Sequence, residues 1–243
     1  MTDKTWTDHA GNAVRSLSSG IYTDHVFTDD GKEIAAVTLG SSTDGEGKIS
    51  LALYNKEGKT THTISQPVVD GDSITTGKDT IINETAYDVN GNVTTYTYDA
   101  ENRLSKVSVT DKDGKTAVIQ QNRYNGDGQR IQKVEGSKTT NYYYQDGVVS
   151  YTTDGDNSQT SQNLIGTDGN ILATQRYGSD HTDYLLYHKD IQGSSTSLVK
   201  EDGSADATYR YTDFGETTIN GDNKAENEVC YTGGIYDQST GLY

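Results

Sequence analysis

The chain has 243 residues, of which 31% are hydrophobic, and a formal net charge of −16. This acidity argues against nucleic acid as a partner, because phosphate binding needs a basic surface. No stretch approaches the ~20 apolar residues of a membrane span, and the N-terminus lacks the basic and apolar regions of a signal peptide. The single cysteine, Cys230, excludes an internal disulfide and a metal site built on several thiolates.

The composition indicates β-structure. Hydrophobic content lies below the roughly 45–50% usual for globular chains, yet the chain holds 18 tyrosines and 26 glycines among many Thr and Val. A tyrosine ring can be buried while its hydroxyl reaches water or backbone. No apolar spacing of three and four residues extends over ten positions, so helices are not expected. We therefore predict an all-β protein with a thin core, built as an extended or hollow sheet.

Residues 1–80 show loose hairpin patterning, and the clearest signal lies in 81–180. Residues 87–104 read "YDVNGNVTTYTYDAENRL", in which one phrase recurs after eleven residues, with Asn102 in the place of Gly91. Imperfect copies occur at 54–60 and 124–131. Such self-similarity is typical of repeat proteins, in which each unit is stabilised by its neighbours. We expect antiparallel hairpins in which Val93 and Leu104 begin the return strands.

Glycine positions predict the turns between these strands. Twelve of the 26 glycines follow Asp or Asn, a pair favoured in two-residue type I′ turns. They are Gly31, Gly45, Gly71, Gly91, Gly114, Gly126, Gly128, Gly147, Gly155, Gly169, Gly203 and Gly221. Residues 139–153 form a further hairpin candidate, with a turn at Asp146-Gly147, Tyr142 and Tyr144 on one face, and Tyr151 on the return strand.

The last zone, 181–243, carries a denser set of motifs: "YHKDIQGS", "YRYTDFGE" and "YTGGIYDQSTGLY". Together with the Tyr-Asp phrases, these motifs resemble the bacterial Rhs/YD-repeat proteins and their Rhs repeat-associated core, a family of cell-wall-associated polymorphic toxins. Two departures are Gln192, where the family usually has Leu, and 212–215, where it usually has Asp-Pro-Phe-Gly. The matching residues are Tyr187, His188, Asp190, Gly193, Ser194, Tyr209, Tyr211, Phe214, Gly215, Glu216, Tyr231, Thr232, Gly233, Tyr236, Asp237, Thr240, Gly241, Leu242 and Tyr243.

The resemblance implies a long, twisted antiparallel sheet that spirals into a hollow shell around a C-terminal toxin, which is the expected partner. It divides the chain into a divergent β-hairpin region (1–80), YD-like repeats (81–180) and a core truncated at its C-terminal end (181–243). It implies a secreted or cell-wall-associated, non-catalytic scaffold, because the family's self-cleavage region and toxin domain would lie beyond Tyr243. We expect no catalytic, cofactor-binding or metal-binding residue, and we expect open sheet edges to favour self-association.

Two other functions remain open. The chain could bind carbohydrate or cell-surface glycans through exposed tyrosines, the best patch being Tyr142, Tyr143, Tyr144 and Tyr151; pairing of these rings across the sheet is the other interpretation. A hydrolase would use His188 and Asp190 with Ser194 or Ser195; the simpler interpretation makes Asp190 and Gly193 part of a turn.

Metal binding has little support in the sequence. Residues 111–114 and 154–157 resemble calcium loops but lack the further oxygen ligands and flanking helices of an EF-hand. The five histidines are dispersed and form no zinc-spaced pair. We therefore expect no cofactor.

Overall fold

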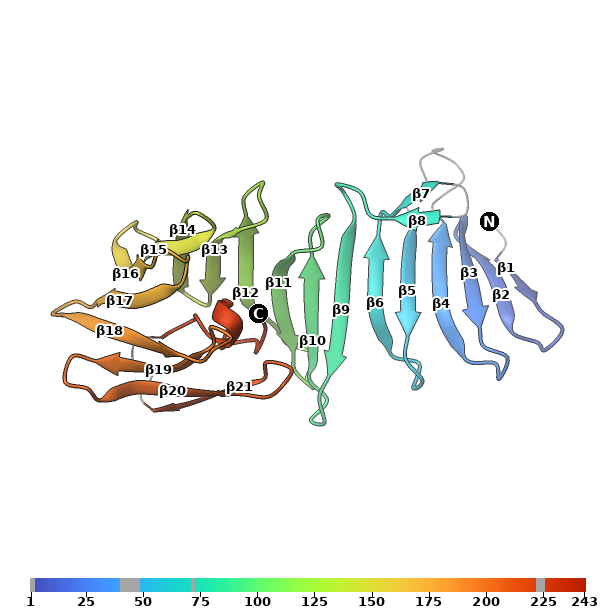
Figure 1. Cartoon of the computed structure of the whole chain (residues 1–243). Helices are drawn as coiled ribbons and strands as arrows, with labels where there is room; N and C mark the ends of the chain where they lie inside the picture. Colours follow the sequence, from blue (N-terminus) through green and yellow to red (C-terminus); the bar gives the residue numbers. More distant parts are fainter. Residues whose placement is uncertain (1–2, 40–48, 71–72, 222–225) are drawn as a thin grey trace. The chain divides into compact units, whose positions relative to one another are not determined.

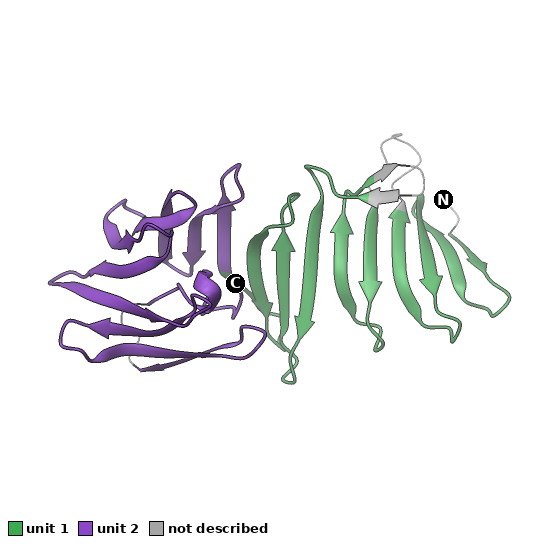
Figure 2. Ribbon diagram, in the orientation of Figure 1, with its two compact units in different colours: residues 1–119 green, residues 120–243 purple. Residues whose placement is uncertain are grey.

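The computed structural model describes residues 3–39, 49–70, 73–221 and 226–243. The fold is all-β, as predicted, and within these residues the helical structure is one 3-10 turn, η1 (Tyr231–Gly233) (Figure 1). The chain divides into two compact units, residues 1–119 and 120–243 (Figure 2). This boundary falls inside the predicted zone 81–180. The three zones describe where the sequence motifs lie, and as domains they stay a prediction. The predicted turns at Gly45 and Gly71 lie outside the described residues.

Unit 1 is an antiparallel sheet in which each strand pairs with the next. Its strands are β1 (Lys4–Thr7), β2 (Ala13–Ser18), β3 (Ile21–Phe27), β4 (Glu33–Leu39), β5 (Ser50–Tyr54), β6 (Thr60–Ser65), β9 (Ile81–Tyr87), β10 (Val93–Tyr98) and β11 (Leu104–Thr110). A separate two-stranded ribbon, β7 (Val68–Asp70) and β8 (Ser73–Thr75), lies between β6 and β9 in the chain. The predicted starts of β10 and β11 at Val93 and Leu104 are confirmed.

Unit 2 continues the same hairpin pattern. Its strands are β12 (Thr116–Tyr124), whose first four residues belong to unit 1, β13 (Arg130–Glu135), β14 (Lys138–Gln145), β15 (Val148–Thr153), β16 (Gln159–Ile165), β17 (Ile171–Tyr177), β18 (Thr182–Lys189), β19 (Ser195–Lys200), β20 (Ala205–Tyr211) and β21 (Thr217–Gly221). These strands curve around the C-terminal segment, residues 226–243, which includes η1 (Figure 2). The concave face of unit 2 is therefore occupied by part of its own chain.

The turn of the repeated phrase differs from the predicted type I′ turn. The Asp88 N–H donates to Asn92 O at 3.1 Å and the Gly91 N–H donates to Asp88 O at 3.2 Å, with Gly91 at φ 84°. This is a three-residue loop whose last residue is left-handed. Asp88 Oδ1 stabilises the loop by accepting the N–H groups of Asn90 and Asn92, each at 2.8 Å. The Asp88 carboxylate therefore favours this three-residue loop over the two-residue type I′ turn.

The second copy of the phrase forms the same loop with asparagine in the left-handed position, since Asn102 has φ 60°. Asparagine tolerates this region better than most residues, so the predicted equivalence of Asn102 and Gly91 is confirmed. The predicted type I′ turn is correct at Asp146-Gly147, where φ is 51° and 84°. That loop has only two residues, because Gln145 pairs directly with Val148.

A bulge follows many of the turns and was not predicted. In the β10–β11 hairpin the pairing passes from Tyr98↔Leu104 to Thr97↔Lys106, which leaves Ser105 as an extra residue. Its hydroxyl donates to Thr97 O at 2.9 Å. Thr61 and Thr196 make the same bond to the carbonyl eight residues earlier. Bulges bend a strand and increase its twist, which favours the curvature seen in unit 2.

The core is thin, as predicted, and it is concentrated in unit 2. Residues from β17 to β20 pack against three residues of the C-terminal segment. This cluster contains Ile171, Leu185, Tyr187, Leu198, Ala207, Tyr209, Val229, Cys230 and Tyr236. Burial of these apolar side chains fixes the C-terminal segment against the sheet.

Candidate functional site

Backbone and hydroxyl groups attach the C-terminal segment to β19. Ser195 donates its N–H to Cys230 O at 3.2 Å and its hydroxyl to Val229 O at 2.7 Å. Ser194 Oγ accepts the N–H of Thr232 at 3.0 Å. Both serines are fully buried, so they serve as attachment points for the segment.

The residues of the hydrolase alternative do not come together as a nucleophile and its base. Asp190 Oδ1 accepts the N–H groups of Gln192 and Ser194, each at 2.9 Å, within its own loop. Gly193 has φ 87° in that loop, so the turn interpretation is correct. His188 is an exposed residue of β18, whereas Ser195 is engaged with the C-terminal segment.

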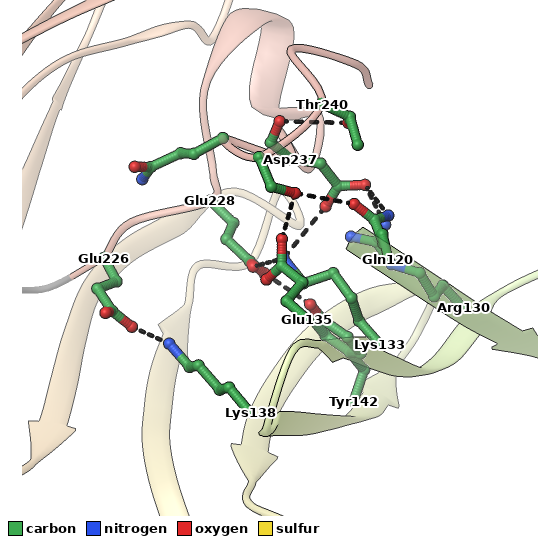
Figure 3. Close-up of polar contacts among 12 residues, drawn as sticks. Gln120, Arg130, Lys133, Glu135, Lys138, Tyr142, Glu226, Glu228, Asp237 and Thr240 are labelled. Atoms are coloured by element: carbon green, nitrogen blue, oxygen red, sulfur yellow. Dashed lines mark hydrogen bonds and ion pairs between the residues drawn. The ribbon is translucent and has the colours of Figure 1, made fainter. Parts of the chain in front are cut away.

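A group of buried and half-buried charges forms the most distinctive polar site of unit 2 (Figure 3). We call Arg130, Lys133, Glu135, Glu228 and Asp237 the charge cluster. Lys133 Nζ lies 3.2 Å from Asp237 Oδ1 and 3.0 Å from Glu135 Oε2, and it also bonds to Glu228. Asp237 Oδ2 accepts from Arg130, and from Gln120 Nε2 at 2.8 Å. The side chains of Lys133 and Asp237 are only 3% and 4% exposed.

The strands position the cations of this cluster through a bulge. Asn122 pairs with Lys133 and Tyr124 pairs with Arg130, with a shift in register between the two pairs. Cross-strand partners share a face, and residues two apart on β12 also share a face. Arg130 and Lys133 therefore point to the same side although three residues separate them, which strict strand alternation would not allow.

Tyr142 of β14 extends the cluster. Its hydroxyl donates to Glu228 Oε2 at 2.9 Å, and the Arg130 guanidinium lies 5.2 Å from the centre of its ring. Burial and the nearby Glu228 carboxylate raise the pKa of Tyr142 above its ordinary value. The tyrosine therefore remains a neutral donor to Glu228 at neutral pH.

Opposite charges keep Asp237 and Lys133 ionised. Burial acts to raise the pKa of Asp237, but the hydrogen bond and charge of Arg130, together with the charge of Lys133, outweigh it and leave that pKa below 3.8. Burial acts to lower the pKa of Lys133, but Glu228 and Asp237 outweigh it and leave that pKa above 10.5. Charges buried in this way are stable only when paired, so the cluster specifies where the C-terminal segment lies.

The four tyrosines of the predicted patch differ in exposure: Tyr143 is exposed, whereas Tyr142 is buried. Tyr143 and Tyr151 stack on one another, with ring centres 4.3 Å apart and an interplanar angle of 6°, so cross-strand pairing is correct for these two rings. Tyr142 is buried, and the Tyr144 hydroxyl donates to Arg130 O at 2.9 Å. The bulge in β15 places Tyr151 opposite Tyr143.

Other candidate chemistry has structural roles. The carboxylates of Asp111 and Asp154 accept backbone N–H groups of their own loops. Among the residues that the structure describes, no group of three or more His, Cys, Asp or Glu could hold a metal ion. The same residues include no helix long and apolar enough to cross a membrane. Cys230 is fully buried, which raises the pKa of its thiol to about 12 and makes it unreactive.

Sequence reasoning missed the charge cluster. Gln120, Arg130 and Lys133 lie 95 to 117 residues before their carboxylate partners, and no local pattern joins such distant positions. In the sequence, Asp237 is distinguished only as one of the residues that match the Rhs family. The only local signal is the presence of two cations, Arg130 and Lys133, in one short strand. Strict alternation would place them on opposite faces, so the sequence gives no sign that both are buried together.

Comparison with known proteins gives one family and several relatives. Residues 83–116 match the family described as RHS Repeat. The chain is 34% identical over 168 residues to the tRNA3(Ser)-specific nuclease WapA of Bacillus spizizenii and, at the same identity and length, to the tRNA nuclease WapA of Bacillus subtilis. The match covers 65% of this chain, and the chain spans about 7% of the length of these relatives.

Solved structures similar to the chain are Tc toxin components. The TcdB2-TccC3-Cdc42 structure matches 89% of this chain and 15% of its own, with 12% identity and a TM-score of 0.36. The Photorhabdus luminescens Tc holotoxin pore matches 98% of this chain and 17% of its own, with 14% identity and a TM-score of 0.32. Residues 83–116 are thus an RHS repeat, and the chain resembles the bacterial Rhs/YD-repeat proteins, as its motifs predict.

Proposed function

We propose that this chain is a non-catalytic scaffold segment of a larger secreted or cell-wall-associated Rhs toxin. In that protein it forms part of the β-shell wall around a C-terminal toxin domain. The observation that carries the proposal is the way in which the strands of unit 2 curve around a segment of their own chain and hold it (Figure 2). A shell wall must hold polypeptide against its concave face, and the sheet of unit 2 does this with its own C-terminal segment.

The contacts with that segment support retention rather than catalysis. Ser194, Ser195 and Asp237 are buried and engaged in hydrogen bonds or ion pairs. The relatives are named as tRNA nucleases, and the chain spans about 7% of their length. We therefore assign a nuclease or other toxic activity to a different part of the longer protein.

Glycan binding through a row of exposed tyrosines has less support. Tyr143 and Tyr151 stack on each other, and Tyr142 is buried beneath the charge cluster. A glycan array probed with the purified chain tests this alternative directly. Binding that is lost in Tyr143→Ala, while Tyr177→Ala retains it, would favour the alternative.

The scaffold proposal is tested on the longer gene product. The reading frame is followed beyond Tyr243, the product is purified, and limited proteolysis measures how fast the downstream domain is cut. We expect slow cleavage in the native protein and cleavage at least about tenfold faster in Lys133→Met, because the variant weakens the hold on the C-terminal segment. A downstream domain cut equally fast in both proteins, or a frame with no further domain, would refute enclosure.

The non-catalytic part of the proposal has its own assay. The purified chain is incubated with total tRNA and the products are resolved on a denaturing gel. We expect no cleavage above the level of a mock purification. Cleavage that persists through purification and disappears in His188→Ala with the fold intact would contradict the assignment.

A further inference from the structure

Three side chains on neighbouring strands of unit 1 form a chain of hydrogen bonds. Ser16 lies on β2, His25 on β3 and Glu33 on β4, and these strands are adjacent in the sheet (Figure 1). Ser16 Oγ lies 3.3 Å from His25 Nε2, and His25 Nδ1 lies 2.8 Å from Glu33 Oε1. A hydroxyl, an imidazole and a carboxylate are thus joined in the order that an activated nucleophile requires.

The sheet places these three side chains on one face. Ser16 pairs directly with Thr23, and His25 lies two residues from Thr23 on the same strand, so Ser16 and His25 share a face. Phe27, two residues further along β3, pairs with Glu33, which brings the carboxylate to that face as well. The contacts are therefore set by the strand order and its register and not by a loop.

Glu33 decides which imidazole nitrogen is the acceptor. An ionised carboxylate only accepts hydrogen bonds, so His25 Nδ1 carries the hydrogen that Glu33 Oε1 accepts. In the neutral ring Nε2 then has an available electron pair, and it faces the Ser16 hydroxyl. His25 is thus oriented as a general base for Ser16, with Glu33 as its positioning residue.

A second hydroxyl–imidazole contact in the same sheet lacks these features. Thr61 Oγ1 lies 3.2 Å from His62 Nδ1, but the Thr61 hydroxyl donates to Leu53 O at 3.2 Å. Within the described part of the chain, no ion pair joins His62 to a carboxylate. The contact of Ser16 with His25 therefore differs from an ordinary polar contact on a sheet, and Thr61 provides an internal comparison.

The face is accessible, but it offers few donors for a developing oxyanion. The side chains of His25 and Glu33 are 22% and 35% exposed, and Ser16 is half-buried. Backbone N–H groups of a sheet point toward the neighbouring strands and not out of the face. A donor has to come from a side chain such as the hydroxyl of Thr23, which is opposite Ser16. We therefore expect an acyl group on Ser16 to be released slowly.

We propose that Ser16 is an acyl-acceptor site that takes a small acyl group from an activated ester or thioester. The Ser16 oxygen bonds to the acyl carbon, and the bond from that carbon to the leaving oxygen or sulfur breaks. The Ser16 proton passes through His25 Nε2 to the leaving group, and the product is an ester of Ser16. The site does not depend on the scaffold proposal, because it needs only the sheet of unit 1 and no turnover.

The test is covalent labelling of the purified full chain with a biotinylated fluorophosphonate, followed by peptide mass spectrometry. The probe loses fluoride when a serine oxygen bonds to its phosphorus. We expect label at Ser16 and none at Thr61 or at the exposed residues Ser18 and Ser19. p-Nitrophenyl acetate should acetylate the same serine in a stoichiometric burst of p-nitrophenolate. Label spread over the exposed serines, or no acetyl group at Ser16, would overturn the proposal.

Variants assign the reactivity to the hydrogen-bonded chain. We expect His25→Gln, with a native-like circular dichroism spectrum, to be labelled at Ser16 at least about tenfold more slowly, because the base is removed. His62→Gln is the matched control, since it changes the histidine that has no carboxylate partner, and it should be labelled at the native rate. Equal rates in His25→Gln and the native chain would refute the assignment.

Two substitutions of Glu33 separate positioning from a purely structural role. In Glu33→Gln the side chain still accepts from His25 Nδ1 but carries no charge, whereas in Glu33→Leu it does neither. We expect the labelling rate of Ser16 to fall from the native chain to Glu33→Gln and further to Glu33→Leu, with the fold intact in both. Equal rates in all three proteins would contradict the positioning role.

Discussion

At the scale of single residues, Lys133 joins the sheet to the C-terminal segment. It is nearly inaccessible and bonds to three carboxylates, two of which lie beyond residue 225. A buried ion pair gives little net stability over an apolar core, but removal of one partner leaves an uncompensated charge. The cluster therefore adds little net stability by itself, but the loss of one charged partner would strongly lower the free energy of unfolding.

Replacement of Lys133 tests this role. We expect Lys133→Met to lower the free energy of unfolding by about 3–5 kcal/mol, because Asp237 and Glu228 lose a buried cation. The measurement is urea denaturation followed by circular dichroism. Lys138→Met is the control: its pair with Glu226 is mostly exposed, so its effect should stay within about 1 kcal/mol. Equal losses in the two variants would contradict a special role for Lys133.

The pKa of Asp237 predicts a dependence on acid. Because its folded-state pKa lies below 3.8, its contribution to stability is fully present above that value. The contribution is lost as the pH falls through the lower folded-state pKa. We expect the unfolding free energy of the native chain to drop more steeply than that of Asp237→Asn as the pH falls below about 4. Parallel pH profiles for the two proteins would show that Asp237 is not responsible.

At the scale of elements, the fold is a repeated hairpin whose loop is set by a few side chains. The Tyr-Asp phrase placed the strands correctly, because aliphatic and aromatic alternation is local information. It did not give the loop type, since the Asp88 carboxylate selects a three-residue loop over the type I′ turn. The bulges were also beyond prediction, because Ser105 and its equivalents have no distinguishing local pattern.

Two glycines of one loop give a matched test of the left-handed position. Gly128 has φ 81° and Gly126 does not lie in the left-handed region, while an added Cβ would meet no atom within 4 Å at either site. We expect Gly128→Ala to destabilise the chain by about 1–2 kcal/mol through backbone strain alone. Gly126→Ala should change stability by no more than about 0.5–1 kcal/mol. Thermal or urea unfolding measures both, and similar losses would argue against the loop geometry.

At the scale of the whole molecule, the acidic charge opposes contact between copies. The outermost strands β1 and β21 each have one pairing partner among the described strands, so each leaves an edge open to another chain. The net charge of −16 repels such contacts over the Debye length, which falls from ~10 Å at 0.1 M salt to ~3 Å at 1 M.

Self-association should therefore increase with salt. We expect light scattering coupled to size-exclusion chromatography to show a rising average mass between low and high ionic strength at fixed protein concentration. Thr218→Lys places a charge at an exposed position of β21 and should reduce the effect. A stable monomer at every salt concentration would refute association through open edges.

The sequence was least informative at this scale. The all-β class and the strand order follow from local patterns, whereas the placement of residues 226–243 against β12 to β20 depends on contacts between distant residues. Ser194 and Ser195 illustrate the difficulty, since their motif suggested either a turn or a nucleophile. Their partners, Thr232 and Val229, lie 38 and 34 residues further along the chain and come close only in the folded, curved sheet.

The distance along the chain between the two halves of the charge cluster has a consequence for how unit 2 is made. Gln120, Arg130 and Lys133 leave the ribosome 95 to 117 residues before Glu228 and Asp237. At roughly 5–20 residues per second, this delay is about 5–23 s. During that interval the early hairpins hold cations whose partners do not yet exist, so their inner face stays hydrated. Completion of unit 2 is thus timed by translation, and the concave face is open to other molecules until the last strands and the C-terminal segment emerge.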